Sequence, residues 1–157
     1  MNTAGHTLYK DLVSETKEIV AGPGSRDEKL KRICELLDSN IDLFDWVGFY
    51  LVDQEAEREL VLGPYIGEET DHTRIPFGKG ICGQAANSLE TFVVQDVSQE
   101  DNYLACSTEV QAEIVIPVMK EGEFVAELDI DSHTKNSLTE DHRKMLEEIC
   151  DIVAEIF

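Results

Sequence analysis

A cysteine in a polar loop is the first residue of this chain that could do chemistry. Cys106 stands in the segment NYLACS, and polar residues typical of loops surround it from about Ser98 to Gln111. Cysteine is usually buried as a small, inert apolar residue. Cys106 therefore either turns into the core or belongs to a loop that presents its thiol to a substrate.

Carboxylates on two successive predicted strands form a second candidate cluster. Side chains alternate along a strand, so AEIVIPV places Glu113 on one face, and ELDIDS places Glu127, Asp129 and Asp131 together on one face. Because the two strands would form a hairpin, these carboxylates could lie close to one another. The alternative is an ordinary half-buried sheet, whose water-exposed face would carry the same residues.

Two aromatic residues are candidates for the wall of the same site. Trp46 and Tyr50 share one face of the strand predicted from WVGFYLV. Aromatic rings attract cations and carboxylates pair with an amine, so the set indicates a pocket for a small cation. Clustered carboxylates repel one another, and at least one is expected to keep a proton near neutral pH. Such an acid could donate its proton to a substrate oxygen.

The other cysteines differ in the positions that the sequence assigns to them. Cys82 begins a short helix predicted from ICGQAANSLE, where the helix dipole and free N–H groups favour a thiolate. Its alternative role is that of a small residue packed beside Gly83. Cys34 and Cys150 fall on or beside apolar helix faces and are expected in the core. The cysteines form no CxxC pair, which argues against a zinc site and against a thioredoxin-like motif.

Length and net charge limit the classes of protein to which this chain can belong. The 157 residues suit one domain, residues 1–157, and the net charge of −20 argues against nucleic acid and anionic membranes as partners. The glycines of GKGICG lack the spacing of a phosphate-binding loop. No apolar run reaches membrane-spanning length, and the N-terminus resembles no signal peptide. We therefore expect a cytoplasmic protein whose cysteines are reduced at rest.

The elements that must position these residues follow from periodicity and capping signals. Helices are predicted over 7–20, after the capping box SRDE at 25–28, and after a second capping box, SLTE, at 137–140. Strands are predicted from WVGFYLV, ELVLGPYIG and TFVVQDV, and from AEIVIPVM and FVAELDID, which form a hairpin over residues 120–123. This order of elements predicts an α+β domain with an antiparallel sheet.

Six segments together resemble a known family. WVGFY, LVLGPY, RIPFGKGICGQA, YLAC, EIVIP and LDIDS, spread from about Asp45 to Ser132, are similar to the free methionine-(R)-sulfoxide reductases, which are stand-alone GAF domains. The resemblance implies a central antiparallel sheet of about six strands, flanked by N- and C-terminal helices, in a homodimer. It implies an L-methionine (R)-S-oxide reductase that forms a cysteine sulfenic acid and then a disulfide, and that a thioredoxin-type reductant resets. No cofactor and no metal are expected.

The resemblance also implies roles for the substrate-binding residues. Trp46 and Tyr50 would line the methyl and sulfur end of methionine sulfoxide. Glu113, Asp129 and Asp131 would bind its amino group and protonate the sulfoxide oxygen.

The two loop regions that carry the implied redox cysteines depart from the family pattern. Cys106 would be the attacking thiolate and Cys82 another redox cysteine, although family members differ in which cysteine attacks and which resolves. His72 stands where the family usually has a third cysteine, often the resolving one, and is most simply an exposed loop residue. Ser107 replaces a family aspartate.

The rival interpretation is a GAF module that binds a small molecule without catalysis, as in sensory proteins. The same pocket would then hold its ligand reversibly. A sensor normally needs an output domain, for which this length leaves no room. The sequence therefore favours the reductase.

Overall fold

The computed structural model describes residues 3–53, 55, 58–104 and 109–157, so Cys106 and Ser107 lie outside the described residues. The helices and strands run in the order α1 Thr3–Ala21, α2 Arg26–Asn40, β1 Trp46–Val52, β2 Glu59–Ile66, β3 Arg74–Pro76, α3 Gly80–Ser88, β4 Phe92–Val94, β5 Ala112–Lys120, β6 Glu123–Ser132 and α4 Glu140–Val153. Two short 3₁₀ helices, Val97–Gln99 and Ala154–Ile156, complete the assignment.

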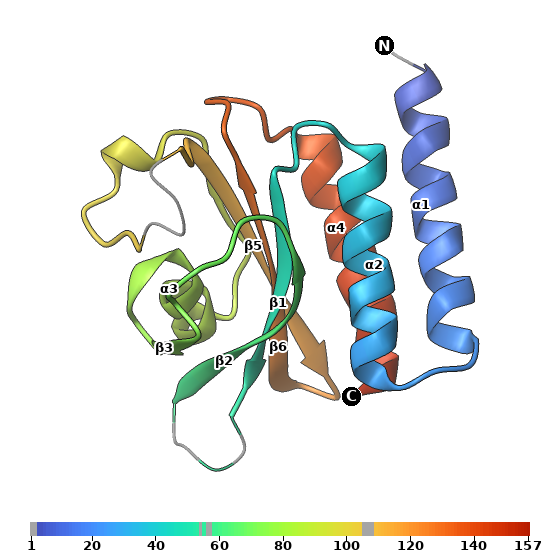
Figure 1. Cartoon of the computed structure of the whole chain (residues 1–157), viewed down its shortest axis with the longest axis horizontal. Helices are drawn as coiled ribbons and strands as arrows, with labels where there is room; N and C mark the ends of the chain where they lie inside the picture. The colour runs from blue at the N-terminus through green and yellow to red at the C-terminus, as the bar shows by residue number, and fades with distance from the viewer. Residues whose placement is uncertain (1–2, 54, 56–57, 105–108) are drawn as a thin grey trace.

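The strands form one six-stranded sheet in the order β3-β2-β1-β6-β5-β4, and every neighbouring pair is antiparallel. The long helices α1, α2 and α4 lie on one side of the sheet, and α3 lies on the other (Figure 1). The predicted α+β architecture with an antiparallel sheet of about six strands is confirmed. No helix in the described ranges combines the length and the apolar character needed to cross a membrane.

The two faces of the sheet pack into two separate apolar clusters, because side chains alternate along the strands. Toward the long helices, Leu128 and Ile130 of β6 are fully buried with residues of α1, α2 and α4. Toward α3, Tyr50 of β1 and Val115 of β5 pack in a second cluster that includes Cys82. The acidic side chains of β6 point to this second face, beneath α3 and the loops around it.

Capping side chains set the starts of two helices. Ser25 accepts a hydrogen bond from the backbone N–H of Glu28 at 3.2 Å, at the predicted position. The predicted cap of α4 was wrong by two residues. Thr139, not Ser137, caps this helix, and His142 completes the reciprocal pair of hydrogen bonds. Ser137 is buried instead and donates to the backbone oxygen of Thr134 at 2.7 Å.

The fourth strand is shorter than the segment TFVVQDV predicts. β4 pairs with β5 only over Phe92–Val94. The chain then turns because the Asp96 side chain accepts a hydrogen bond from the backbone N–H of Ser98 at 3.0 Å, which starts the 3₁₀ helix. An aspartate that accepts a hydrogen bond from the backbone two residues further on competes with strand pairing, and the strand ends before it.

Candidate active site

Three antiparallel strands bring the acidic residues together. In the β5–β6 hairpin Glu113 is paired with Asp131, and on the other side of β6 the residue Gly48 of β1 is paired with Asp129. Glu113, Glu127, Asp129 and Asp131 are all at most 3% exposed. The alternative that places them on a water-exposed face is therefore wrong, because α3 and its flanking loops cover this face.

Close backbone packing at glycines lets α3 approach the turn that precedes it. The backbone N–H of Gly78 donates to the oxygen of Gly83 at 2.7 Å. A Cβ atom at Gly83 would lie only 2.7 Å from the backbone oxygen of Pro76, so no larger residue fits there without a shift of the backbone. This packing holds the first turn of α3, and with it Cys82, above the carboxylates.

The thiol of Cys82 points at these carboxylates. Its Sγ atom lies 4.0 Å from Oε2 of Glu113, and ligand atoms of Cys82, Glu113 and Asp129 all lie within 4.8 Å of one another. Burial raises the pKa of Cys82 well above its usual value, and the charges of Asp129 and three other carboxylates raise it further. The expected thiolate at this helix start is therefore wrong, because desolvation outweighs the helix dipole.

Two of the acids are also poorly suited to ionisation. Burial raises the pKa of Glu127 well above its usual value, and the charge of Asp129 adds to this shift. Burial also raises the pKa of Asp129, against the lowering effect of hydrogen bonds from Glu113 and Cys82. The carboxylate of Glu127 is fully buried, and a hydrogen bond from the Cys82 thiol opposes the rise in its pKa only in part. The expectation that at least one carboxyl keeps its proton agrees with these pKa directions.

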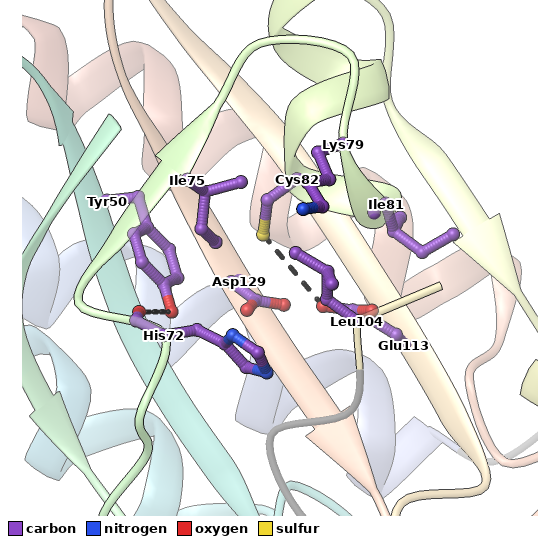
Figure 2. Close-up of a pocket in the computed structure, with 10 residues that line it drawn as sticks. Tyr50, His72, Ile75, Lys79, Ile81, Cys82, Leu104, Glu113 and Asp129 are labelled. Carbon is purple, nitrogen blue, oxygen red and sulfur yellow. Dashed lines mark hydrogen bonds between the residues drawn. The ribbon is translucent and has the colours of Figure 1, made fainter. Parts of the chain in front are cut away.

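A narrow cavity opens between α3 and the sheet (Figure 2). Of the residues predicted for the site, Tyr50, Cys82, Glu113 and Asp129 line it. The described lining does not include Trp46 or Asp131. The full set of described lining residues is Tyr50, His72, Ile75, Lys79, Gly80, Ile81, Cys82, Leu104, Glu113 and Asp129.

The aromatic residues form a stack beside this cavity. The Trp46 ring lies between Tyr50 and Tyr65, with ring centroids 6.4 and 5.3 Å away, and its Nε1 donates to the backbone oxygen of Glu68 at 2.9 Å. The Tyr50 hydroxyl donates to the backbone oxygen of His72 at 2.9 Å. Tyr50 thus fixes the segment that carries His72, and its own ring is stacked with that of Trp46.

Two lining residues were missed or misjudged from the sequence. His72 is half-buried and its ring points into the cavity, so the expectation of an exposed loop histidine was wrong (Figure 2). Lys79 precedes α3 directly and adds a cation to an otherwise acidic site. Its place in GKGICG, three residues before Cys82, was a signal that could have found it.

The cysteines at 34 and 150 lie in the core, as predicted. Both are fully or almost fully buried, and each thiol points at a backbone oxygen: that of Pro64 for Cys34 and that of Ile116 for Cys150. Burial raises the pKa of both thiols. They lie on the helix side of the sheet, opposite the acidic cavity.

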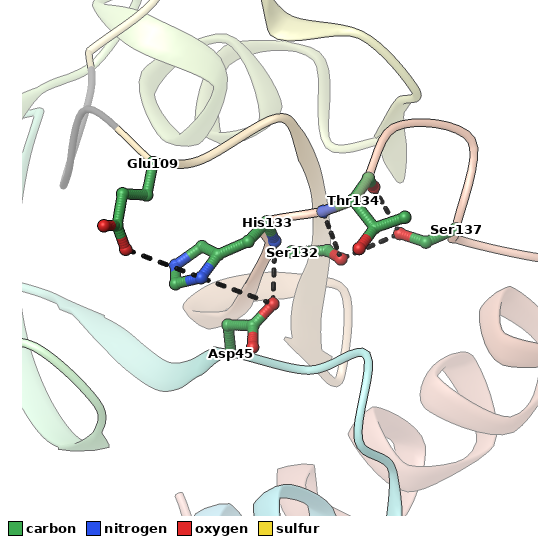
Figure 3. A network of polar contacts seen from close by, with 6 residues as sticks. All are labelled: Asp45, Glu109, Ser132, His133, Thr134 and Ser137. Carbon is green, nitrogen blue, oxygen red and sulfur yellow. Dashed lines mark hydrogen bonds and ion pairs between the residues drawn. The ribbon is translucent and has the colours of Figure 1, made fainter.

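A polar network braces the end of the sheet next to Asp131 (Figure 3). The backbone N–H of His133 donates to Oδ2 of Asp45 at 2.7 Å, and the His133 ring nitrogen Nδ1 lies 3.8 Å from Asp45 and 3.8 Å from Glu109. The backbone N–H of Asp45 donates to the oxygen of Asp131 at 2.9 Å. This network joins the starts of β1 and β5 to the end of β6.

Comparison with known proteins agrees with this geometry. A sequence profile of the GAF domain matches residues 24–157. GAF domain-containing protein A of Dictyostelium discoideum is 37% identical, over 90% of this chain and 87% of that protein. The free methionine-R-sulfoxide reductase of Saccharomyces cerevisiae is 34% identical, over 93% of this chain and 86% of that protein.

The same group appears among solved structures. The free methionine-R-sulfoxide reductase of Neisseria meningitidis, solved in complex with its substrate, superimposes with a TM-score of 0.91 at 34% identity. The match covers 100% of this chain and 91% of that one. This chain therefore belongs to the GAF domain family, in the group that contains the free methionine-R-sulfoxide reductases.

Proposed function

We propose that this protein reduces free methionine-(R)-sulfoxide to methionine with thiols as the source of electrons. The observation that carries the proposal is the buried cavity in which Cys82, Glu113 and Asp129 meet. Burial of carboxylates is unfavourable unless they are paired, so this buried acidic cluster is expected to bind a cationic ligand. The ammonium group of a free amino acid suits them, and relatives at 34% identity are named as reductases of this amino acid sulfoxide.

The raised pKa values favour a role for a neutral acid. A protonated carboxyl, such as that of Asp129, can donate a hydrogen bond and then its proton to the sulfoxide oxygen. Protonation makes the sulfoxide sulfur electrophilic. The thiolate of Cys106 then attacks, the substrate's sulfur–oxygen bond breaks, methionine leaves, and the oxygen stays on Cys106 as a sulfenic acid.

Cys82 is assigned to the second step. Its buried, protonated thiol is a poor first nucleophile, since attack needs a thiolate. When Cys106 carries a sulfenic acid, the sulfur of Cys82 forms a bond to the sulfur of Cys106, the sulfenic oxygen leaves as water, and a disulfide results. A thioredoxin-type dithiol returns two electrons and two protons by exchange, and is itself oxidised to a disulfide.

The test is turnover of free L-methionine-(R)-sulfoxide by the purified protein with thioredoxin, thioredoxin reductase and NADPH. The (S) epimer serves as the control substrate. We expect NADPH consumption that depends on the (R) epimer and on this protein, and methionine in equal amount. No methionine from either epimer would refute the proposal.

One observation favours a second candidate, a GAF module that binds a small molecule without catalysis. The described thiol of the cavity, Cys82, is held in its unreactive protonated form. In that case methionine sulfoxide or a similar amino acid would bind, be recovered unchanged, and leave the oxidation state of every cysteine as it was. Mass spectrometry of the protein after a single equivalent of sulfoxide distinguishes the two.

A further inference from the structure

We propose that Lys79 forms a carboxylate-binding subsite, so that the cavity recognises both charged groups of a free amino acid. The inference deepens the proposed function and rests on it for the identity of the ligand. Glu113 and Asp129 supply the negative part of the site, and Lys79 supplies a cation on the same lining. An α-amino acid carries its ammonium and carboxylate on one carbon atom, so a site that binds both needs adjacent groups of opposite charge.

The position of Lys79 is set by the start of α3. It is the N-cap residue, with an extended backbone (φ −102°, ψ 129°), and its side chain makes no capping hydrogen bond. The residue is exposed, and its side chain runs from the helix start toward Cys82, beside the cavity that both residues line (Figure 2).

Lys79 is the one lysine or arginine among the described residues that line the cavity. No hydrogen bond or ion pair within 4.0 Å engages its ammonium within the described ranges. Two basic residues nearby in the chain are engaged elsewhere: Arg74 pairs with Asp53 at 2.6 Å, and Arg58 donates to Asn87 and lies over the ring of Phe77. Lys79 is thus the available counter-charge for an anionic ligand group.

The backbone beside Lys79 favours the same ligand charge. The first N–H groups of a helix lack acceptors within the helix, and the helix dipole makes this end positive. The N–H of Gly80 is satisfied by Oδ1 of Asn102 at 2.8 Å. Ile81 and Cys82 follow in the first turn of α3, and both line the cavity. A carboxylate next to Lys79 would face this positive helix end.

Burial of Asp129 supports the opposite half of the subsite. Its carboxylate is fully buried, with Glu113 and Cys82 as hydrogen-bonding neighbours. A ligand's ammonium group favours the ionised form of a nearby acid such as Asp129, so Lys79 and Asp129 then give the cavity a positive and a negative side. A zwitterion is stabilised at both ends in such a field, whereas a ligand without a carboxylate leaves Lys79 without a partner.

The test measures binding and turnover of two ligands by three proteins. The ligands are L-methionine-(R)-sulfoxide and its carboxamide, which keeps the ammonium and the sulfoxide but has no carboxylate. The proteins are the wild type, Lys79→Met, and Lys17→Met, which removes an exposed lysine of α1 as a matched control. Calorimetry, with Cys106→Ser added to each protein so that bound sulfoxide is not consumed, gives the dissociation constants, and the thioredoxin-coupled assay of the proteins that retain Cys106 gives kcat/KM.

For the wild type and Lys17→Met we expect tighter binding of L-methionine-(R)-sulfoxide (the acid) than of its carboxamide (the amide). Lys79→Met should weaken binding of the acid about tenfold or more, as loss of a charge-assisted contact does, and change binding of the amide less than about twofold. Lys79→Arg should recover part of the affinity for the acid. Lys79→Met should likewise lower kcat/KM for the acid much more than kcat/KM for the amide.

The proposal is overturned if Lys79→Met affects acid and amide equally, or neither. It is also overturned if the wild type does not discriminate between them or binds neither. Failure of the reductase hypothesis looks different: the acid binds, with the expected dependence on Lys79, but no methionine forms. The two hypotheses therefore have separate outcomes in one set of measurements.

Discussion

Cys82 Sγ lies 4.0 Å from Glu113 Oε2, although the two residues are 31 positions apart in the chain. The relationship joins the start of α3 to the start of β5 across the covered face of the sheet. Burial disfavours the thiolate of Cys82, and the charges of Asp129 and three other carboxylates, Glu113 among them, disfavour it further. The site is therefore arranged to hold protons in the absence of a ligand, which agrees with chemistry that begins by protonating an oxygen.

The first prediction concerns the division of work among the cysteines. Cys106→Ser should abolish formation of methionine, even in a single turnover. Cys82→Ser should release about one equivalent of methionine and then stop, because the sulfenic acid finds no second thiol. The measurement is methionine per protein in the absence and presence of thioredoxin.

Cys34→Ala and Cys150→Ala are the controls, since both thiols are buried on the opposite side of the sheet. Their activity per folded molecule should equal that of the wild type. Absence of a single-turnover burst in Cys82→Ser, with a burst in Cys106→Ser, would reverse the roles of the two cysteines.

The second prediction concerns the form of the substrate. Carboxylates such as Glu113 would bind a free ammonium group, which methionine inside a peptide lacks. We expect turnover of the free sulfoxide and none of N-acetylmethionine sulfoxide amide. Glu113→Gln should lower kcat/KM for the free sulfoxide by about tenfold or more, the usual effect of losing a charged contact. Equal rates on both substrates would contradict the assignment.

The third prediction concerns stability and pH. Burial raises the pKa of Glu127 in the folded protein above its unfolded value. The folded state then binds the proton more tightly, so the contribution of Glu127 to stability is greatest below its unfolded pKa and is lost as the pH rises toward its folded pKa. Glu127→Gln stays neutral and should increase the free energy of unfolding at pH 8 by at least ~1 kcal/mol relative to the wild type.

This gain should disappear near pH 4, where the wild-type acid is also neutral. Urea denaturation at both pH values is the measurement. Glu18→Gln, at an exposed position of α1, is the matched control and should show no such pH-dependent gain. A gain that is equal at both pH values would show that charge is not its cause.

The fourth prediction concerns His142 in the first turn of α4. Its Nδ1 accepts a hydrogen bond from the backbone N–H of Thr139 at 3.1 Å, which requires the neutral ring. Burial lowers the pKa of His142 in the folded protein. The unfolded chain therefore takes up this proton first, and the contribution of His142 is lost as the pH falls below its unfolded value of about 6.5.

Asn is a suitable replacement because its side-chain oxygen can accept the same hydrogen bond without titrating. We expect the wild type to lose stability relative to His142→Asn between pH 7.5 and 5.5, by up to ~1 kcal/mol. Thermal denaturation of both proteins across this range is the measurement. Parallel curves would show that protonation of His142 does not affect stability.

The fifth prediction concerns assembly. α1 packs on α4, which itself lies against the sheet, and half-buried Tyr9 and Val13 and the buried Met145 line a shallow groove between the two helices. We expect a homodimer through these terminal helices in sedimentation at micromolar concentration. Val13→Glu should shift the equilibrium toward the monomer, whereas Glu15→Gln, on an exposed position of α1, should not. A wild-type monomer at high micromolar concentration would refute this.

The order and kind of the secondary structure elements are determined by local sequence patterns. The alternation in AEIVIPV and ELDIDS was sufficient to place Glu113 and Asp129 on faces that meet, because a hairpin with a short turn fixes its own register. Capping was less predictable. Both Ser137 and Thr139 have the chemistry of a cap, and the choice of Thr139 depends on the packing of His142 against the rings of Tyr9 and Phe44.

Burial of the acidic face was decided only by the tertiary structure. Periodicity shows which residues share a face but not what covers that face, and the cover here is α3, a segment distant in sequence from β6. For the same reason the ionisation state of Cys82 was predicted wrongly: the helix start is a local signal, whereas desolvation and the nearby carboxylates come from the assembled sheet. The cation of Lys79 and the ring of His72 likewise belong to the site through folding alone, because what lines a cavity depends on long-range packing.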